Sequence, residues 1–451
     1  MNGAWRIAAR NLARSRRRNL ATGLAVAFGY AALLIVGGYV IRVDSYLRTS
    51  SVYLGHLGHV GVFKKDGLEQ FLIKPSKYAL TESDQELIRA ELEHDPAVDM
   101  FGASLLGSGL VGNGCKTMPF VGYGVDLELE ARIRSHPEVL EHARELSKPV
   151  KGQTLVEAKS VDGPVTLGVT LAHRLGKSRV HEEAPEPLLE AVDCMAPDAA
   201  QKISADANVQ LASAAFDGSF TAVDGEVVGH LSTGVLATDG QTLWTSVETL
   251  QRLYDTDSIT SFVVFLRDPG AAREYGQNLE RRLTTRGLDV EVYDFEDEKM
   301  NPYYVGTVQF LFVMAGFILT VVTSVVTLSI LNSMTMTILE RAREIGTLRS
   351  LGFTRRQVTG LFVREAMILT LTGEVVGSVL GFLVATGVRL ANVRFQPPAV
   401  ARPIQLLFTP TLELAAGLAV GLLALAAIAT FAATRRTVSS GIAELNTAVT
   451  G

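Results

Sequence analysis

The sequence predicts a membrane protein with four transmembrane α-helices, one N-terminal and three C-terminal, and a large mixed α/β extracytoplasmic domain inserted after the first helix. Four apolar stretches are long enough to cross the hydrocarbon core of a bilayer. Residues 43–304 hold 41 acidic and 24 basic residues, whereas the rest of the chain holds 18 Arg, no Lys and 6 Glu. A division of charge this sharp indicates that the two parts face different solvents.

The first predicted helix covers residues 20–42. Residues 1–19 carry six arginines, and residues 20–41 carry no charge. The apolar run is too long for a signal peptide and lacks a small-x-small cleavage site, so we expect an uncleaved anchor. Because arginines are retained on the cytoplasmic side, residues 1–19 form a predicted cytoplasmic segment and the following domain is exported.

The predicted exported domain covers residues 43–304 and contains no apolar run of membrane length. A polar stretch at 181–224 suggests two subdomains. Helical periodicity predicts helices at 80–93, capped by Thr81 or Ser83, and at 273–286. Residues rich in β-branched and aromatic side chains predict three strands, at 60–63, 227–232 and 261–266.

Both cysteines, Cys115 and Cys194, fall in this acidic domain. A disulfide is compatible with an oxidising compartment, but two cysteines are not a disulfide framework. Two unpaired buried thiols fit the sequence equally well, so the pairing stays open.

Three further transmembrane helices are predicted in the C-terminal part, with a charged elbow and an outer loop between them. The predicted order is a helix at 305–333, a cytoplasmic elbow at 334–365, a helix at 366–388, an external loop at 389–413, a helix at 414–434 and a cytoplasmic tail at 435–451. The N-terminal segment, the elbow and the C-terminal tail, which are expected in the cytoplasm, hold six, six and two arginines. The external loop holds three. We therefore expect a multi-pass protein of the bacterial inner membrane with both termini in the cytoplasm.

The elbow reads as a capped pair of helices. Ile338, Ala342, Ile345 and Leu348 are spaced to form one apolar stripe. Gly352 supplies the left-handed residue that ends a helix. Thr354 and Gln357 are spaced as a capping box that opens the next helix. The alternative, an ordinary solvated loop, is less favoured because such loops are short and irregular.

Charged side chains cover the other faces of the first elbow helix. These are Glu340, Arg341, Arg343, Glu344 and Arg349. Two i,i+3 pairs of opposite charge, Glu340–Arg343 and Arg341–Glu344, would support the helix. A face of this kind is typical of a contact with a protein partner.

The helix that follows the elbow carries two features of its own. Gly373, Gly377 and Gly381 recur every four residues, which is the small-xxx-small pattern of close helix packing. Glu374 is the one charged residue inside an apolar stretch. Such residues are costly in lipid and often functional, but solvation or a hydrogen bond near the helix end explains it as well.

The sequence predicts no catalytic, cofactor-binding or metal-binding residues. The Gly-x-Gly-x-x-Gly spacing at 107–112 is followed by a turn signal rather than a helix, and Leu171 stands where a phosphate loop ending at 176–178 needs glycine. His56 and His59 lack nearby ligands for a local metal site. There is no nucleophile elbow and no basic tract typical of nucleic-acid binding.

The elbow sequence LERAREIGTLRSLGFTRRQVTGLFVREA, at 339–366, resembles the hallmark stretch of FtsX-like permeases. The run WRIAARNLARSRRRNLATGLAVAFG at 5–29 looks like the first helix of the same superfamily. Residues 119–126 and 216–257 resemble, more loosely, the exported domain of LolC/LolE lipoprotein-releasing and MacB-like permeases.

This resemblance implies a non-enzymatic subunit of an ABC transporter. In the family, two permeases pair, as a homodimer or with a sister subunit, and each docks a cytoplasmic ATPase that binds ATP. Carried over, the ATPase contact would comprise Glu340, Arg341, Arg343, Glu344, Ile345, Leu348 and Arg349. MacB itself carries its ATPase at its N-terminus, and no phosphate loop is present in these residues, so a partner would supply it.

The resemblance leaves the cargo open among lipoprotein, lipid and peptide, as well as the use of a periplasmic adaptor. The alternative is a regulator of the FtsX division type that switches an envelope enzyme such as a cell-wall hydrolase. The exported domain is larger than is usual for that type. A membrane-anchored enzyme is a third reading, with no recognisable catalytic set behind it.

Overall fold

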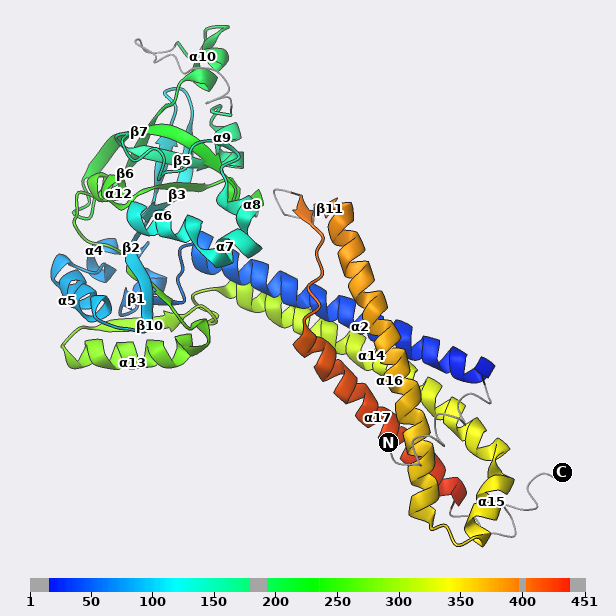
Figure 1. Cartoon of the computed structure of the whole chain (residues 1–451). Coiled ribbons are helices and arrows are strands. Elements are labelled where there is room, and N and C mark those ends of the chain that lie inside the picture. The colour runs from blue at the N-terminus through cyan, green and yellow to red at the C-terminus, as the bar shows by residue number, and fades with distance from the viewer. Residues whose placement is uncertain (1–15, 179, 181–192, 235, 397–402, 439–451) are drawn as a thin grey trace. The chain divides into compact units, whose positions relative to one another are not determined.

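The computed structural model describes residues 16–178, 180, 193–234, 236–396 and 403–438. The chain divides into two compact units (Figure 1). We call them the helical unit, built from the residues up to Asp44, Val308–Arg394 and the residues from Gln405, and the sheet unit, Ser45–Thr307 with Phe395–Ile404. The predicted segment before residue 16 and the predicted tail beyond residue 438 lie outside the described residues.

Four helices in the described part of the chain are long and apolar enough to cross a membrane. They are α2 (Arg16–Thr49), α14 (Pro302–Glu340), α16 (Arg355–Ala391) and α17 (Leu412–Val438). Each is longer than the apolar stretch that predicted it, because a helix ends where its backbone is capped rather than where apolar residues stop. Two short strands, β11 (Arg394–Phe395) and β12 (Ile404–Gln405), pair between α16 and α17.

One apolar cluster holds the helical unit together. It contains residues of all four long helices, among them Tyr30, Ile330, Leu369 and Leu422. The outer faces of the same helices remain exposed and apolar, as at Phe317 on α14 and Val379 on α16. An exposed apolar surface of this extent suits a lipid environment.

The sheet unit is built around one ten-stranded mixed sheet. Its strands follow the order β10-β1-β9-β2-β3-β8-β5-β7-β4, and β6 pairs with β2 and β7. The strands are β1 (Val60–Lys64), β2 (Val98–Gly112), β3 (Thr117–Val125), β4 (Lys151–Gly152), β5 (Pro164–Gly168), β6 (Asn208–Ala214), β7 (Phe220–Leu231), β8 (Thr242–Ser246), β9 (Ser261–Leu266) and β10 (Val290–Asp294). The three strands predicted from the sequence correspond to β1, the end of β7 and β9.

Helices cover this sheet and the ends of its strands (Figure 1). They are η1 (Ser50–Leu54), α3 (Gly67–Gln70), α4 (Pro75–Tyr78), α5 (Glu82–Glu93), α6 (Leu127–Ser135), α7 (Pro137–His142), α8 (Arg144–Ser147), α9 (Val169–Arg174), α10 (Ala199–Ala205), α11 (Leu236–Asp239), α12 (Val247–Tyr254), η2 (Pro269–Ala271) and α13 (Ala272–Thr285). Of these, α5 and α13 are the two predicted helices, and Thr81 caps α5 in a capping box with Asp84.

The amphipathic helices α12 and α13 bury their apolar sides on the sheet. Leu250 and Leu253 of α12 are fully buried where it packs on β2, β3 and β7. Leu279 and Leu283 of α13, spaced four residues apart, are fully buried against β10 and β1. This spacing places side chains on one face of a helix, so the sequence pattern and the packing agree.

One ten-stranded sheet runs through the region in which the sequence suggested two subdomains. The reason is the length of β2, which covers fifteen residues. Its first half pairs with β9, and its second half pairs with β6 as well as β3. A single strand therefore joins both halves of the sheet.

Two stretches with rejected motifs have structural roles in the sheet unit. The glycines at 107–112 lie within β2, and Tyr254 packs against Gly107. Lys177 is fully buried, and its Nζ donates to the carbonyl and the carboxylate of Asp206 at 2.8 and 2.9 Å. Neither stretch is arranged as a nucleotide loop.

Cys115 and Cys194 form a disulfide, with their Cα atoms 5.5 Å apart. Cys115 lies in the turn between β2 and β3, and Cys194 precedes α10. The bond joins segments 79 residues apart in the sequence. The question that the sequence left open is therefore resolved in favour of a pair.

Candidate functional site

The elbow consists of α15 (Ala342–Ser350) between the end of α14 and the start of α16. Gly352 has a φ of +94°, which is the left-handed conformation that a glycine adopts without strain. The hydroxyl of Thr354 accepts from the backbone of Gln357, and the Gln357 amide oxygen accepts from the backbone of Thr354. The two helices thus meet at a turn in which both ends are capped.

The apolar stripe of the elbow lies inside the chain. Ile338, Ala342 and Ile345 are buried in a cluster with Val358 and Phe362 of α16. Leu348 packs against the same cluster. The sequence places Ile345 and Leu348 in the predicted partner contact. In the structure Ile345 has no exposed surface, so its side chain packs inside the elbow.

Arg341 holds the elbow against α16. Its guanidinium donates to both carboxylate oxygens of Glu365, at 3.0 and 3.1 Å, and to Glu344 at 2.7 Å. It also lies over the ring of Phe362, 5.2 Å from its centre. Since Glu365 is only 2% exposed, this pair is an internal one, and Arg341 is a residue that positions the elbow.

Glu340 ties the end of α14 to the start of α2. The Nη1 of Arg18 donates to both carboxylate oxygens of Glu340 at 2.7 Å, and its Nη2 donates to Thr337 at 2.8 Å. Because the guanidinium donates to Glu340 and to Thr337 at once, the contact fixes geometry as well as charge. The predicted i,i+3 pair between Glu340 and Arg343 is therefore replaced by a contact between segments 322 residues apart.

The exposed large apolar side chains beyond α15 lie in the turn of the elbow. Leu351 is 73% exposed and Phe353 is 47% exposed. Arg343 and Thr347 are exposed on the adjoining face of α15. We call these four residues the elbow tip. Exposed Arg355 and Arg356 follow directly in the sequence, and Arg349 is half-buried, so the surroundings of the tip are basic.

The three packing glycines of α16 lie against α2. A Cβ added at Gly373 would come within 2.8 Å of Val26, one at Gly377 within 2.5 Å of the Ala27 carbonyl, and one at Gly381 within 3.3 Å of Leu34. Since real Cβ contacts under 3.0 Å are essentially never seen, the first two positions depend on glycine for this helix spacing.

Glu374 is buried in the same helix. It is 2% exposed, and neither of its carboxylate oxygens has a hydrogen-bond partner among the described residues. Tyr30 of α2 lies close enough to interact with it electrostatically. The structure thus does not place Glu374 in solvent.

Sequence reasoning missed two residues of this site, Arg18 and Glu365. Arg18 counted only as one positive charge of the N-terminal segment, and Glu365 only as the end of the elbow. Periodicity within the elbow carries no information about either, because their partners lie on other helices.

His56 and His59, considered as a metal pair, have separate partners in the sheet unit. His56 Nε2 lies 3.0 Å from the carboxylate of Glu130. His59 Nδ1 accepts from the backbone of Leu266 at 2.9 Å. Among the described residues there is no group of three or more His, Cys, Asp or Glu side chains arranged to hold a metal ion.

Comparison with known proteins gives a family match that includes the elbow. Residues 316–442 match the family described as FtsX-like permease C-terminal. The chain is 37% identical over 92 residues to the pyoverdine export ATP-binding/permease protein PvdT of Pseudomonas entomophila, which is 20% of this chain and 14% of that protein. It is 28% identical over 149 residues to the macrolide export ATP-binding/permease protein MacB of Nitrobacter winogradskyi, which is 31% and 22%.

A shorter match, 42% identical over 55 residues, is to the uncharacterized ABC transporter permease YknZ of Bacillus subtilis and covers 12% of this chain and 14% of that one. These matches cover between 14% and 22% of the length of the three relatives.

Two solved structures are also similar. The extracellular domain of the noncanonic ABC-type transporter YknZ from Gram-positive bacteria is 14% identical and covers 52% of this chain and 99% of that chain, with a TM-score of 0.31. The periplasmic region of MacB from Actinobacillus actinomycetemcomitans is 13% identical and covers 52% and 87%, with a TM-score of 0.31. Residues 316–442, which include α15 and the elbow tip, are thus similar to the C-terminal part of FtsX-like permeases.

Proposed function

We propose that this chain is the permease subunit of an ABC transporter of the MacB or lipoprotein-releasing type, and that a separate ATPase docks on the elbow tip. The observation that carries the proposal is the tip itself. Leu351 and Phe353 are exposed at a rigid, capped turn inside the region that matches FtsX-like permeases. Exposed apolar side chains beside arginines are the residue types found in the centre of protein interfaces.

The proposal places the elbow in the cytoplasm and the sheet unit outside it. The arginine-rich segments at 1–19 and 334–365 favour this orientation. The net charge of −17 at 43–304 indicates that this part faces a different solvent from the rest of the chain. ATP would then be bound by the partner, and this subunit would contribute no catalytic residue of its own.

Motion imposed on the tip would pass to three helices of the helical unit. Arg341 joins α15 to α16 through Glu365, and Glu340 joins the end of α14 to α2 through Arg18. Both α2 and α14 continue in the sequence into the sheet unit. A push at the tip would therefore have a continuous covalent and ion-paired route to the domain that would handle the substrate.

The test is a photo-crosslinking amino acid placed at Leu351 and, as a matched control, at Ile73 of the sheet unit, which is similarly exposed at 68%. We expect a protein with a phosphate loop to be captured at Leu351 and not at Ile73. Capture of the same ATPase at both positions, or of no such protein at Leu351, contradicts the proposal.

A charge substitution measures the strength of the contact. Leu351→Glu should weaken copurification of the ATPase by roughly tenfold, which corresponds to about 1.4 kcal/mol. Ile73→Glu, which also replaces an exposed aliphatic side chain with glutamate, should leave the copurification unchanged. Equal effects of both substitutions would show that Leu351 is not in the interface.

The cargo class has its own test. Photo-crosslinkers in the sheet unit that capture a lipoprotein or lipid would support the transporter of envelope substrates. Capture of a cell-wall hydrolase would favour the alternative, a regulator of the FtsX type that switches an envelope enzyme.

A further inference from the structure

The sheet unit contains a partly enclosed cavity of about 200 Å³. It lies beside the segment that follows α2, where η1, Gly55 and His56 form one wall. Strands β3 and β8 and helices α6 and α8 contribute the other walls. All of these residues belong to the sheet unit, and none is part of the elbow.

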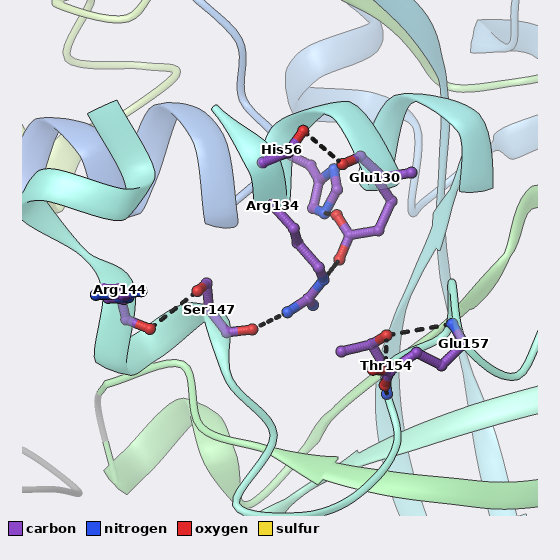
Figure 2. A network of polar contacts seen from close by, with 9 residues as sticks. His56, Glu130, Arg134, Arg144, Ser147, Thr154 and Glu157 are labelled. Carbon is purple, nitrogen blue, oxygen red and sulfur yellow. Dashed lines mark hydrogen bonds and ion pairs between the residues drawn. The ribbon is translucent and has the colours of Figure 1, made fainter. Parts of the chain in front are cut away.

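One wall of the cavity is a buried ionic network (Figure 2). Glu130 is 3% exposed and is approached by both His56 and the guanidinium of Arg134. Burial alone would raise the pKa of the Glu130 carboxyl, but His56 and Arg134 hold that pKa below its usual value. The guanidinium also donates to the backbone carbonyl of Ser147, so Arg134 is fixed in place at the edge of the cavity.

Another part of the cavity lining is apolar and aromatic. Trp244 and Tyr123 are stacked, with ring centres 6.3 Å apart and an angle of 26° between the planes. Leu155 and Leu231 belong to the same buried cluster as Trp244. An aromatic and aliphatic wall of this kind favours a flat or branched apolar group.

Two groups in the cavity lining, the guanidinium of Arg134 and the indole of Trp244, can donate hydrogen bonds but cannot accept them. Arg134 carries five N–H donors, and its contacts in the described chain involve its Nε and Nη1 atoms. The indole N–H of Trp244 makes no hydrogen bond among the described residues. These donors call for a ligand that brings acceptor oxygens.

The size of the cavity limits the ligand to a small molecule. An engineered cavity of about 150 Å³ holds one benzene molecule. A cavity of about 200 Å³ has room for one ring and a short acidic group. A peptide or an acyl chain of membrane lipid length is too large to be enclosed.

We propose that this cavity binds a small organic acid with a single aromatic or branched aliphatic group, its carboxylate on Arg134 and its apolar group against Trp244. The ligand would touch Leu54 and His56, which follow directly on the helix that leads from the helical unit. His56 has a φ of +53°, a conformation that L-residues rarely adopt, so the backbone there is held by its surroundings. Occupancy of the cavity would therefore act on the junction between α2 and the sheet unit.

The test uses the full chain in lipid nanodiscs, with Trp5→Phe as background so that Trp244 is the one remaining tryptophan. Phenylacetate is the probe, because it has one ring and a carboxylate. We expect a saturable change in Trp244 fluorescence and a raised unfolding temperature. Acetate, which lacks the ring, and 2-phenylethanol, which lacks the acid, should each bind at least roughly tenfold more weakly.

Two variants on neighbouring helices separate the cavity from general effects. Leu146 on α8 lines the cavity, whereas Leu140 on α7 does not and is 45% exposed. Leu146→Phe should weaken phenylacetate binding by roughly tenfold, and Leu140→Phe should leave it unchanged. Absence of saturable binding, equal binding of acetate, or equal effects of the two substitutions would overturn the proposal. None of these readouts needs the ATPase, so failure here leaves the proposed function intact.

Discussion

The buried carboxylates of this protein differ in whether an opposite charge lies beside them. Arg341 and Glu365 form an ion pair at the base of the elbow in which the carboxylate has almost no contact with solvent. Removing one partner of such a pair leaves a buried charge uncompensated, which costs several times more than an exposed pair is worth. Glu374 shows the opposite situation, since its carboxylate has no partner among the described residues.

His59 predicts a pH dependence of stability in the sheet unit. Burial lowers the pKa of His59 from 6.5 to about 4, and the charge of Arg48 and the neighbouring His136 act in the same direction. The folded state therefore favours the neutral ring. The contribution of neutral His59 to the free energy of unfolding is complete above pH 6.5. It is lost as the pH falls towards 4, and the loss amounts to about 3 kcal/mol over that range.

The measurement is thermal unfolding of the full chain between pH 4 and pH 8. His59→Asn keeps an acceptor for the Leu266 N–H but cannot titrate, so it should lose less stability than the native chain between pH 6.5 and pH 4. His94→Asn, at an exposed position, is the control and should behave like the native chain. A His59→Asn variant with unchanged pH dependence would contradict the assignment.

At the scale of elements, the contact between α16 and α2 depends on glycine. Gly377→Ala would put a Cβ within 2.5 Å of the Ala27 carbonyl, so the helices must separate. We expect destabilisation by about 1–3 kcal/mol, the usual cost of overpacking. The measurement is thermal unfolding in detergent.

Gly387 on the same helix provides the matched control. A Cβ there meets nothing within 4 Å, so Gly387→Ala should be neutral or stabilising by up to about 1 kcal/mol from helix propensity. If both alanine variants behaved alike, close packing at Gly377 would not be what determines the helix spacing.

At the scale of the whole molecule, the disulfide and the division of charge both favour a sheet unit outside the cytoplasm. Disulfides persist in oxidising compartments, and Cys115 and Cys194 lie in the acidic part of the chain. The proposed orientation puts that part outside the cytoplasm. Protein taken from native membranes should therefore show no thiol that reacts with maleimide until it is reduced.

The bond should also stabilise the sheet unit. Closing a loop of 79 residues is worth about 4.5 kcal/mol in the chain-entropy account. Reduction should lower the unfolding temperature of the native chain and leave a Cys115→Ser, Cys194→Ser double variant unaffected. Two reactive thiols in unreduced protein would contradict both the pairing in the cell and the exported placement.

Much of the architecture follows from sequence alone because its causes are local. Apolar length determines the four long helices, and a glycine with positive φ and the Thr354 capping box determine the elbow. Runs rich in β-branched and aromatic residues determine β1 and β9. Each of these depends on neighbours a few residues away. The resemblance to FtsX-like permeases also rests on one continuous stretch of sequence.

Only the tertiary structure shows which face of the elbow helix is buried and which is exposed. The apolar stripe of α15 is visible in the sequence, yet only packing shows that Ile345 lies against α16 and that Leu351 and Phe353 are exposed instead. The pairing of Arg18 with Glu340, the disulfide and the cavity beside Trp244 join residues far apart in the chain. Sequence periodicity predicts that a helix has an apolar face. Which segment that face packs against depends on how distant parts of the chain come together.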